Sequence, residues 1–156
     1  AQLHPQLRED GRVLCVEKVN ARSLSATDFE AACVNYTGAG GQFDPEEHGD
    51  EPLNLEFDVV VGDLSFISQT LVLPAVVPCL KPGGTLLTLV KPQFELQPGQ
   101  VGKGGIVKDD AMYAIVEQRL REACAELGLT VTAWFDSPIE GGDGNREFFI
   151  CATKAI

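Results

Sequence analysis

Asp63, Lys91 and Glu147 are the residues of this sequence whose types and positions could carry chemistry. Asp63 directly follows the apolar run 57–62, Lys91 directly follows the run 85–90, and Glu147 opens the last apolar run. A charge that abuts a buried strand is costly unless it is paired or used. An amine and two carboxylates suit ion pairing and acid–base chemistry, but their spacing alone does not choose a reaction.

The order of the expected elements brings these residues to one edge. Strands alternate with helices, which predicts a largely parallel sheet with right-handed crossovers. The last two strands are joined by a loop of about ten residues that is too short for a parallel crossover, so we expect them to be antiparallel. Ligands bind beyond the carboxyl ends of parallel strands. Asp63 and Lys91 end such strands, and Glu147 begins the reversed strand, so all three should share this edge.

A simpler interpretation stays open for each of these residues. Asp63 could form a turn, Lys91 could be a solvated strand end, and Glu147 could be its partner in a surface salt bridge. The convergence of all three on a binding edge favours the functional interpretation.

The expected elements follow from apolar runs and their flanking residues. We expect strands at residues 12–18, 57–62, 85–90, 130–135 and 147–153. We expect helices that start near Ser25 or Thr27, at Ser68 with bends at Pro74 and Pro78, and at Asp109 with an end at Gly128. The apolar face of the last helix is expected to comprise Met112, Ile115, Val116, Leu120, Ala123 and Leu127. The sequence "KPGG" at 81–84 predicts a turn, and the acidic stretch 35–53 predicts an exposed loop insertion.

Charge and cysteine content narrow the class of protein. The net charge of -11 disfavours nucleic-acid binding by the chain as a whole, but the four lysines between Lys81 and Lys108 face a single acid, Glu95. The five cysteines include no CxxC pair, which favours reduced thiols of a cytoplasmic protein over a metal site or disulfides. No apolar run approaches the roughly 18 residues of a membrane span.

Four motifs carry a resemblance to a known family. The motifs are "DLSFIS" at 63–68, "VKPQFE" at 90–95, "VGKGGIV" at 101–107 and "GNREF" at 144–148. In this order they resemble the TlyA (haemolysin A-like) family of FtsJ-type methyltransferases, from about residue 13 to residue 150. The resemblance implies a Rossmann-like methyltransferase fold, mostly parallel with one reversed strand. It also implies 2′-O-methylation of ribose in ribosomal RNA with S-adenosylmethionine as cofactor.

The resemblance also implies roles for single residues. The family's Lys-Asp-Lys-Glu tetrad places its Asp, second Lys and Glu on Asp63, Lys91 and Glu147, with Lys91 as the base. The residues implied to bind the cofactor are Asn20, Ala21, Asp63 and Leu64. Those implied to bind the substrate are Phe94 beside the target base, Lys103 and Lys108 with the Gly102–Gly105 backbone near phosphate, and Arg146.

Other parts of the family pattern have no counterpart in the sequence. These are the first tetrad lysine, the glycine-rich strand-turn-helix, the second strand and an amino-terminal S4-like domain. We therefore expect residues 1–156 to be one truncated methyltransferase domain that lacks its first two strands. Two alternatives follow: an inactive domain that binds partners or copies of itself through exposed strand edges, and a membrane-active haemolysin, which the negative charge disfavours.

Overall fold

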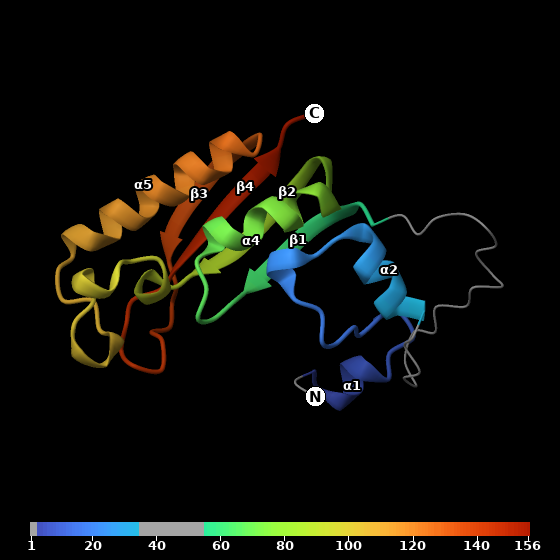
Figure 1. The fold of residues 1–156 in the computed structure, drawn as a ribbon, viewed down its shortest axis with the longest axis horizontal. Coiled ribbons are helices and arrows are strands. Elements are labelled where there is room, and N and C mark those ends of the chain that lie inside the picture. The colour runs from blue at the N-terminus through green and yellow to red at the C-terminus, as the bar shows by residue number, and fades with distance from the viewer. Residues whose placement is uncertain (1–2, 35–54) are drawn as a thin grey trace. The chain divides into compact units, whose positions relative to one another are not determined.

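The computed structural model describes residues 3–34 and 55–156 and divides the chain into two compact units, 1–55 and 56–156 (Figure 1). The predicted insertion at 35–53 lies outside the described residues. Within the described parts of the chain, no helix is both long and apolar enough to cross a membrane.

The first unit contains short helices and no strand among its described residues. Its elements are α1 (Pro5–Arg8), the 3-10 helix η1 (Ala21–Ser23) and α2 (Ala26–Val34). Ser25 Oγ accepts a hydrogen bond from the Asp28 amide at 3.1 Å, so Ser25 is the cap of α2. The strand predicted at 12–18 is wrong, because an apolar β-branched segment becomes a strand only where a second strand pairs with it, and none of the described strands pairs with this segment.

The second unit is built on a four-stranded sheet in the order β1-β2-β4-β3. The strands are β1 (Phe57–Asp63), β2 (Leu80–Val90), β3 (Leu129–Asp136) and β4 (Phe148–Lys154). β1 and β2 are parallel, and β4 lies antiparallel between β2 and β3. The predicted mostly parallel sheet with one reversed strand is therefore confirmed.

The "KPGG" segment at 81–84 does not form the predicted turn between two elements. It belongs to β2, and the register with β1 shifts between Phe57 and Val59, which pair with Leu80 and Thr85. The extra residues of β2 are accommodated by Gly83, whose φ of 78° favours glycine.

Two helices cover one face of the sheet. α4 (Gln69–Val76) contains Pro74 and continues into η2 (Val77–Cys79), which contains Pro78. α5 (Ala111–Glu126) starts where Asp109 Oδ1 accepts a hydrogen bond from the Ala111 amide at 2.9 Å, and it ends before Gly128, whose φ is 76°. Three further 3-10 helices lie between β2 and α5: η3 (Pro92–Phe94), η4 (Pro98–Gln100) and η5 (Lys103–Gly105).

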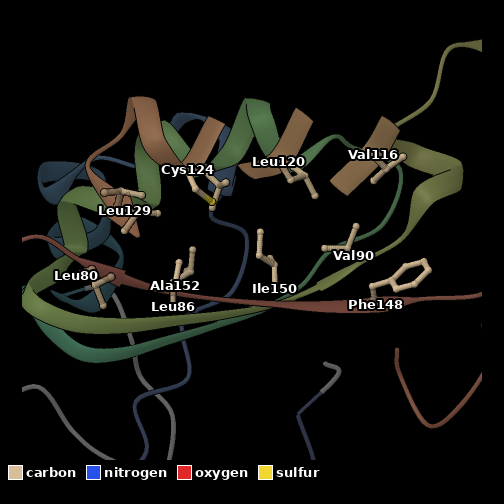
Figure 2. Packing of buried hydrophobic residues seen from close by; sticks show 12 residues of the cluster. Leu80, Leu86, Val90, Val116, Leu120, Cys124, Leu129, Phe148, Ile150 and Ala152 are labelled. Atoms are coloured by element: carbon tan, nitrogen blue, oxygen red, sulfur yellow. The ribbon is translucent and has the colours of Figure 1, made fainter. Parts of the chain in front are cut away.

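The core lies between this face and α5. Figure 2 shows alternate side chains of β2 and β4, such as Val90 and Ile150, pointing toward Val116, Leu120 and Cys124 of α5. Ile115, predicted on the buried face of α5, is instead 39% exposed. Because strand side chains alternate between faces, the residues between the core positions of β2 and β4 point to the opposite face.

Cys15, Cys79, Cys124 and Cys151 are free thiols. Cys15 and Cys124 are buried, and Cys79 and Cys151 are half-buried. Burial raises the pKa of the Cys79 and Cys124 thiols, which keeps them protonated and unreactive at neutral pH.

A buried polar network joins α4 to the end of β2. Glu95, which is 5% exposed, accepts hydrogen bonds from the Ser68 hydroxyl and from the Gln69 amide (2.8 Å) at the start of α4. The Gln69 side chain donates to the Leu89 carbonyl at 2.8 Å and accepts from the Thr88 hydroxyl at 2.7 Å. Burial raises the pKa of the Glu95 carboxyl, and the hydrogen bonds from Gln69 and Ser68 partly oppose this. One carboxylate therefore fixes the start of α4 against η3.

The raised pKa of Glu95 predicts a pH trend in stability. The unfolded chain loses this proton near pH 4.3 and the folded protein at higher pH, so the contribution is fully present below about pH 4.3 and is lost as pH rises through the folded pKa. The free energy of unfolding of wild type should therefore fall relative to that of Glu95→Gln between pH 4 and 7. Urea unfolding at several pH values measures this difference. Glu126→Gln, at an exposed position, is the control substitution. A wild-type stability that rises relative to Glu95→Gln over this range would contradict the assignment.

Candidate active site

An ion pair connects the carboxyl ends of the two parallel strands. Lys91 Nζ lies 2.6 Å from Asp63 Oδ1 and donates a hydrogen bond to Ser65 Oγ at 2.9 Å. The parallel register places Asp63 beside Leu89, so Asp63 and Lys91 extend from the same face of the sheet, opposite α5. The Lys91 side chain is 14% exposed and that of Asp63 is 70% exposed, so the amine is sheltered while the carboxylate faces solvent.

Glu147 comes to the same edge through the antiparallel pairing of β2 with β4. Val90 pairs with Phe148, and the next step of this register places Lys91 opposite Glu147. Residues directly opposite in antiparallel strands have Cβ atoms about 4.5–5.5 Å apart. Lys91 keeps an extended backbone (φ -112°, ψ 97°), so the alternation of faces continues to it. The three predicted residues thus share one edge and one face.

Glu147 is a mostly buried residue whose carboxylate has no bonded partner among the described residues. Glu147 is 8% exposed, and across residues 3–34 and 55–156 no hydrogen bond or ion pair reaches its side chain. Its carbonyl accepts from the Ser137 amide at 2.8 Å. Gly141 lies so close that a Cβ there would stand 2.7 Å from Glu147 Oε1. A carboxylate with free acceptor capacity opposite a lysine is an arrangement suited to binding a proton donor.

Two aromatic rings border the ion pair. Lys91 is followed by Pro92, which lacks a backbone donor and ends β2, and the η3 turn then presents Phe94. Phe66 follows Ser65, has a φ of 63° and is 89% exposed. The ring centroids of Phe66 and Phe94 are 4.9 Å apart. A bulky residue in the left-handed region is uncommon and often marks a functional turn.

Ser65 and Phe66 are site residues that sequence reasoning missed. Both belong to the "DLSFIS" motif, which offered the signal, but apolar periodicity carries no information about a loop residue with positive φ.

The two lysines predicted to contact phosphate, Lys103 and Lys108, lie on a loop that the Asn145 side chain holds in place. The buried side chain of Asn145 accepts from the Val107 amide at 3.0 Å and donates to the Gly105 carbonyl at 2.9 Å. Lys103 and Lys108 are exposed on this loop, and the stem of Lys108 lies against Gly102, where a Cβ would stand 2.7 Å from Lys108 Cε.

Arg146 is engaged with the protein itself. Its guanidinium donates to Asp136 at 2.7 Å and lies 4.9 Å above the centre of the Tyr113 ring. The hydrogen bond to Asp136 raises the pKa of Arg146. This cation therefore joins the ends of β3 and β4, and a phosphate would have to compete with Asp136 for it.

The four residues predicted to bind the cofactor are divided between the units. In the second unit, Leu64 is half-buried next to Asp63. In the first unit, Asn20 caps η1 by accepting from the Arg22 amide at 3.0 Å, and Ala21 begins η1. Asn20 also lines a cavity of about 290 Å³, together with Glu17, Lys18, Val19, Ser23, Asp28 and Ala32.

Comparison with known proteins places this geometry in a family. A TlyA protein of Mycobacterium tuberculosis, named as a 16S/23S rRNA (cytidine-2'-O)-methyltransferase, is 38% identical over 149 residues, covering 96% of this chain and 47% of the relative. Hemolysin A of Brachyspira hyodysenteriae is 31% identical over 147 residues, covering 94% of this chain and 52% of the relative. A solved structure of a hemolysin-named protein from Streptococcus thermophilus has a TM-score of 0.77 at 32% identity and covers 99% of this chain and 47% of that one.

The chain spans about half the length of these relatives. The model of the FtsJ-like methyltransferase family matches residues 1–154. A match over nearly the whole chain, on a sheet whose edge gathers Asp63, Lys91 and Glu147, shows that this protein belongs to the FtsJ-like methyltransferases.

Proposed function

We propose that the protein methylates ribose 2′-hydroxyl groups of ribosomal RNA, with S-adenosylmethionine as methyl donor and Asp63, Lys91 and Glu147 as catalytic residues. The observation that carries the proposal is the 2.6 Å ion pair between Lys91 and Asp63 at the edge where α/β sheets bind ligands. The name of the Mycobacterium tuberculosis relative supports ribosomal RNA as the substrate.

Lys91 is the residue proposed to move the proton. Methylation of a hydroxyl requires that the oxygen give up its proton while it bonds to the methyl carbon. In its neutral form the Lys91 amine accepts this proton at Nζ. Asp63 and Ser65, at 2.6 and 2.9 Å, fix the position of Nζ. The negative charge of Glu147, which lies opposite Lys91 in the strand register, is proposed to stabilise the proton on the amine.

Asp63 and Leu64 of the second unit are proposed to bind the cofactor. Asn20 and Ala21, which the structure describes within the first unit, are the other cofactor-binding residues that the family pattern implies. S-adenosylmethionine supplies a methyl group on a positively charged sulfur. The Asp63 carboxylate is 70% exposed at the strand end, which suits a nearby cation. The cavity at Asn20 offers polar side chains of the kind that can hydrogen-bond an adenosyl group.

Phe66 and Phe94 are proposed to flank the target nucleobase. Sequence-specific proteins bind unstacked RNA bases on exposed aromatic rings, and Phe66 is 89% exposed beside the ion pair. Lys103 and Lys108 are proposed to contact RNA phosphates next to this site, with Arg146 as a weaker contact because Asp136 already binds it.

Ribosomal subunits are the proposed partner, and the cytoplasm is the proposed location. A net charge of -11 opposes RNA binding, so we propose that an amino-terminal S4-like domain supplies additional affinity. We also propose that residues 1–156 form one methyltransferase domain. Among the described strands β1 pairs only with β2, and its Val59 and Val61 are 59% and 71% exposed. This edge is the proposed route to self-association.

The first test replaces the proposed base. Lys91→Ala in the full-length protein should lower the rate of ribosomal RNA methylation by about 10²- to 10⁴-fold, the usual contribution of a positioned base. The control is Lys81→Ala. Lys81 also extends from β2 and pairs with an Asp of β1, Asp58, at 3.2 Å, but it lies at the opposite end of β2 from Lys91. Transfer of labelled methyl groups to purified ribosomal subunits measures both rates. A Lys91→Ala protein within twofold of wild type would remove Lys91 from the mechanism.

The second test concerns the aromatic pair. Phe66→Ala should weaken RNA binding by about 1–3 kcal/mol, the value of one base stacked on an aromatic ring, and Phe66→Trp should retain it. Ile139→Ala, which removes an apolar side chain that is 73% exposed, is the control. Fluorescence anisotropy with an rRNA fragment measures the affinity. Equal binding by Phe66→Ala and wild type would exclude stacking.

The third test moves Glu147 without replacing it. Gly141→Ala adds a Cβ 2.7 Å from Glu147 Oε1, so the flexible carboxylate must shift. The methylation rate should fall about tenfold or more, since displacement by about 1 Å can have a hundredfold effect. The stability loss should be small. Gly142→Ala meets nothing within 4 Å and should behave as wild type. Normal methylation by Gly141→Ala would show that the position of Glu147 is not important.

A further inference from the structure

We propose that Asn145 is a positioning residue that couples the RNA-contacting loop at residues 102–108 to the Glu147 carboxylate. This inference rests on the proposed function and adds a residue to it. Its basis is the buried Asn145 side-chain amide, which hydrogen-bonds to the loop backbone. Asn145 also lies two residues before Glu147 in the sequence.

The Asn145 side chain bonds the loop backbone through both of its ends. Oδ1 accepts from the Val107 amide at 3.0 Å, and Nδ2 donates to the Gly105 carbonyl at 2.9 Å. Asn145 is 2% exposed, so neither of these backbone groups finds water easily if the amide is lost. A carboxylate has the same shape but cannot donate to Gly105, so only an amide serves both partners.

Among the described residues, the other hydrogen bonds of this loop are internal to it. Gly104 and Gly105 have φ values of 80° and 78°, and the loop closes on itself where the Gly102 amide donates to the Ile106 carbonyl at 2.8 Å. Val107 is buried, whereas Lys103 and Lys108 are exposed. Asn145 therefore fixes the backbone from which both lysines extend.

The backbone of Asn145 also holds the wall beside Glu147. Its carbonyl accepts from the Gly141 amide at 2.9 Å, and Gly141 is the residue that leaves room for Glu147 Oε1. Loop 137–145 thus lies next to the Glu147 carboxylate, and Asn145 connects it to the loop at residues 102–108. RNA bound at Lys103 and Lys108 is in this way kept at a fixed distance from Glu147 and Lys91.

The test is a comparison of RNA binding and methylation in the full-length protein. Each phosphate contact contributes about 0.7–0.9 to the slope of log affinity against log salt concentration. Asn145→Ala should reduce this slope by as much as the double variant Lys103→Ala/Lys108→Ala does. The triple variant that combines all three substitutions should reduce the slope no further. The rate at saturating RNA should fall at least about tenfold, while affinity for S-adenosylmethionine stays unchanged.

Asn145→Asp serves where the alanine variant is too unstable, because it keeps the volume and the acceptor for Val107. It should show the same loss of slope, since it cannot donate to Gly105. A folded variant with lower thermal stability but the wild-type slope would assign Asn145 a merely structural role and overturn the inference. Absence of methylation by the wild-type protein is a separate outcome, which would reject the proposed function itself.

Discussion

The pairing register of β2 is the constraint on which the site depends. β2 binds β1 on one side, where Asp63 lies beside Leu89, and β4 on the other, where Phe148 lies beside Val90. A slip by one residue on either side would turn a carboxylate to the opposite face of the sheet, against the core. The core residues at alternate positions, such as Val90 and Ile150, prevent this slip because they must stay under α5. The hydrophobic effect thereby sets the position of three charged groups that it does not itself stabilise.

Buried polar side chains then fix the loops that continue from these strands. Glu95 holds the start of α4, which follows Ser65 and Phe66, against the η3 turn that follows Lys91. In the same way, Asn145 holds the loop at residues 102–108 against the segment that leads into β4. Each is a single buried side chain that accepts bonds from a segment distant in sequence. Because loops fixed in this way are already ordered, they lose little conformational entropy when a ligand binds, which is what the proposed RNA site requires.

Strand direction could be predicted from the sequence, and with it the edge shared by Asp63, Lys91 and Glu147. A short loop before the last strand was sufficient, because chain length decides whether two strands can be parallel. Features that depend on a distant partner could not be predicted. The segment at 12–18 has the composition of a strand but no strand beside it, and the guanidinium of Arg146 is bound by Asp136, ten residues away. Phe66 has a φ of 63° and is 89% exposed, and no apolar pattern predicts either property.

A double-mutant cycle on the methylation rate tests most directly whether Asp63, Lys91 and Glu147 act as one unit. Asp63→Asn, Glu147→Gln and the double variant are compared with wild type in single-turnover transfer to ribosomal subunits. If both carboxylates act through the same amine, the double variant should be little slower than the slower single variant. Effects that multiply, or a Glu147→Gln protein with the wild-type rate, would contradict the account.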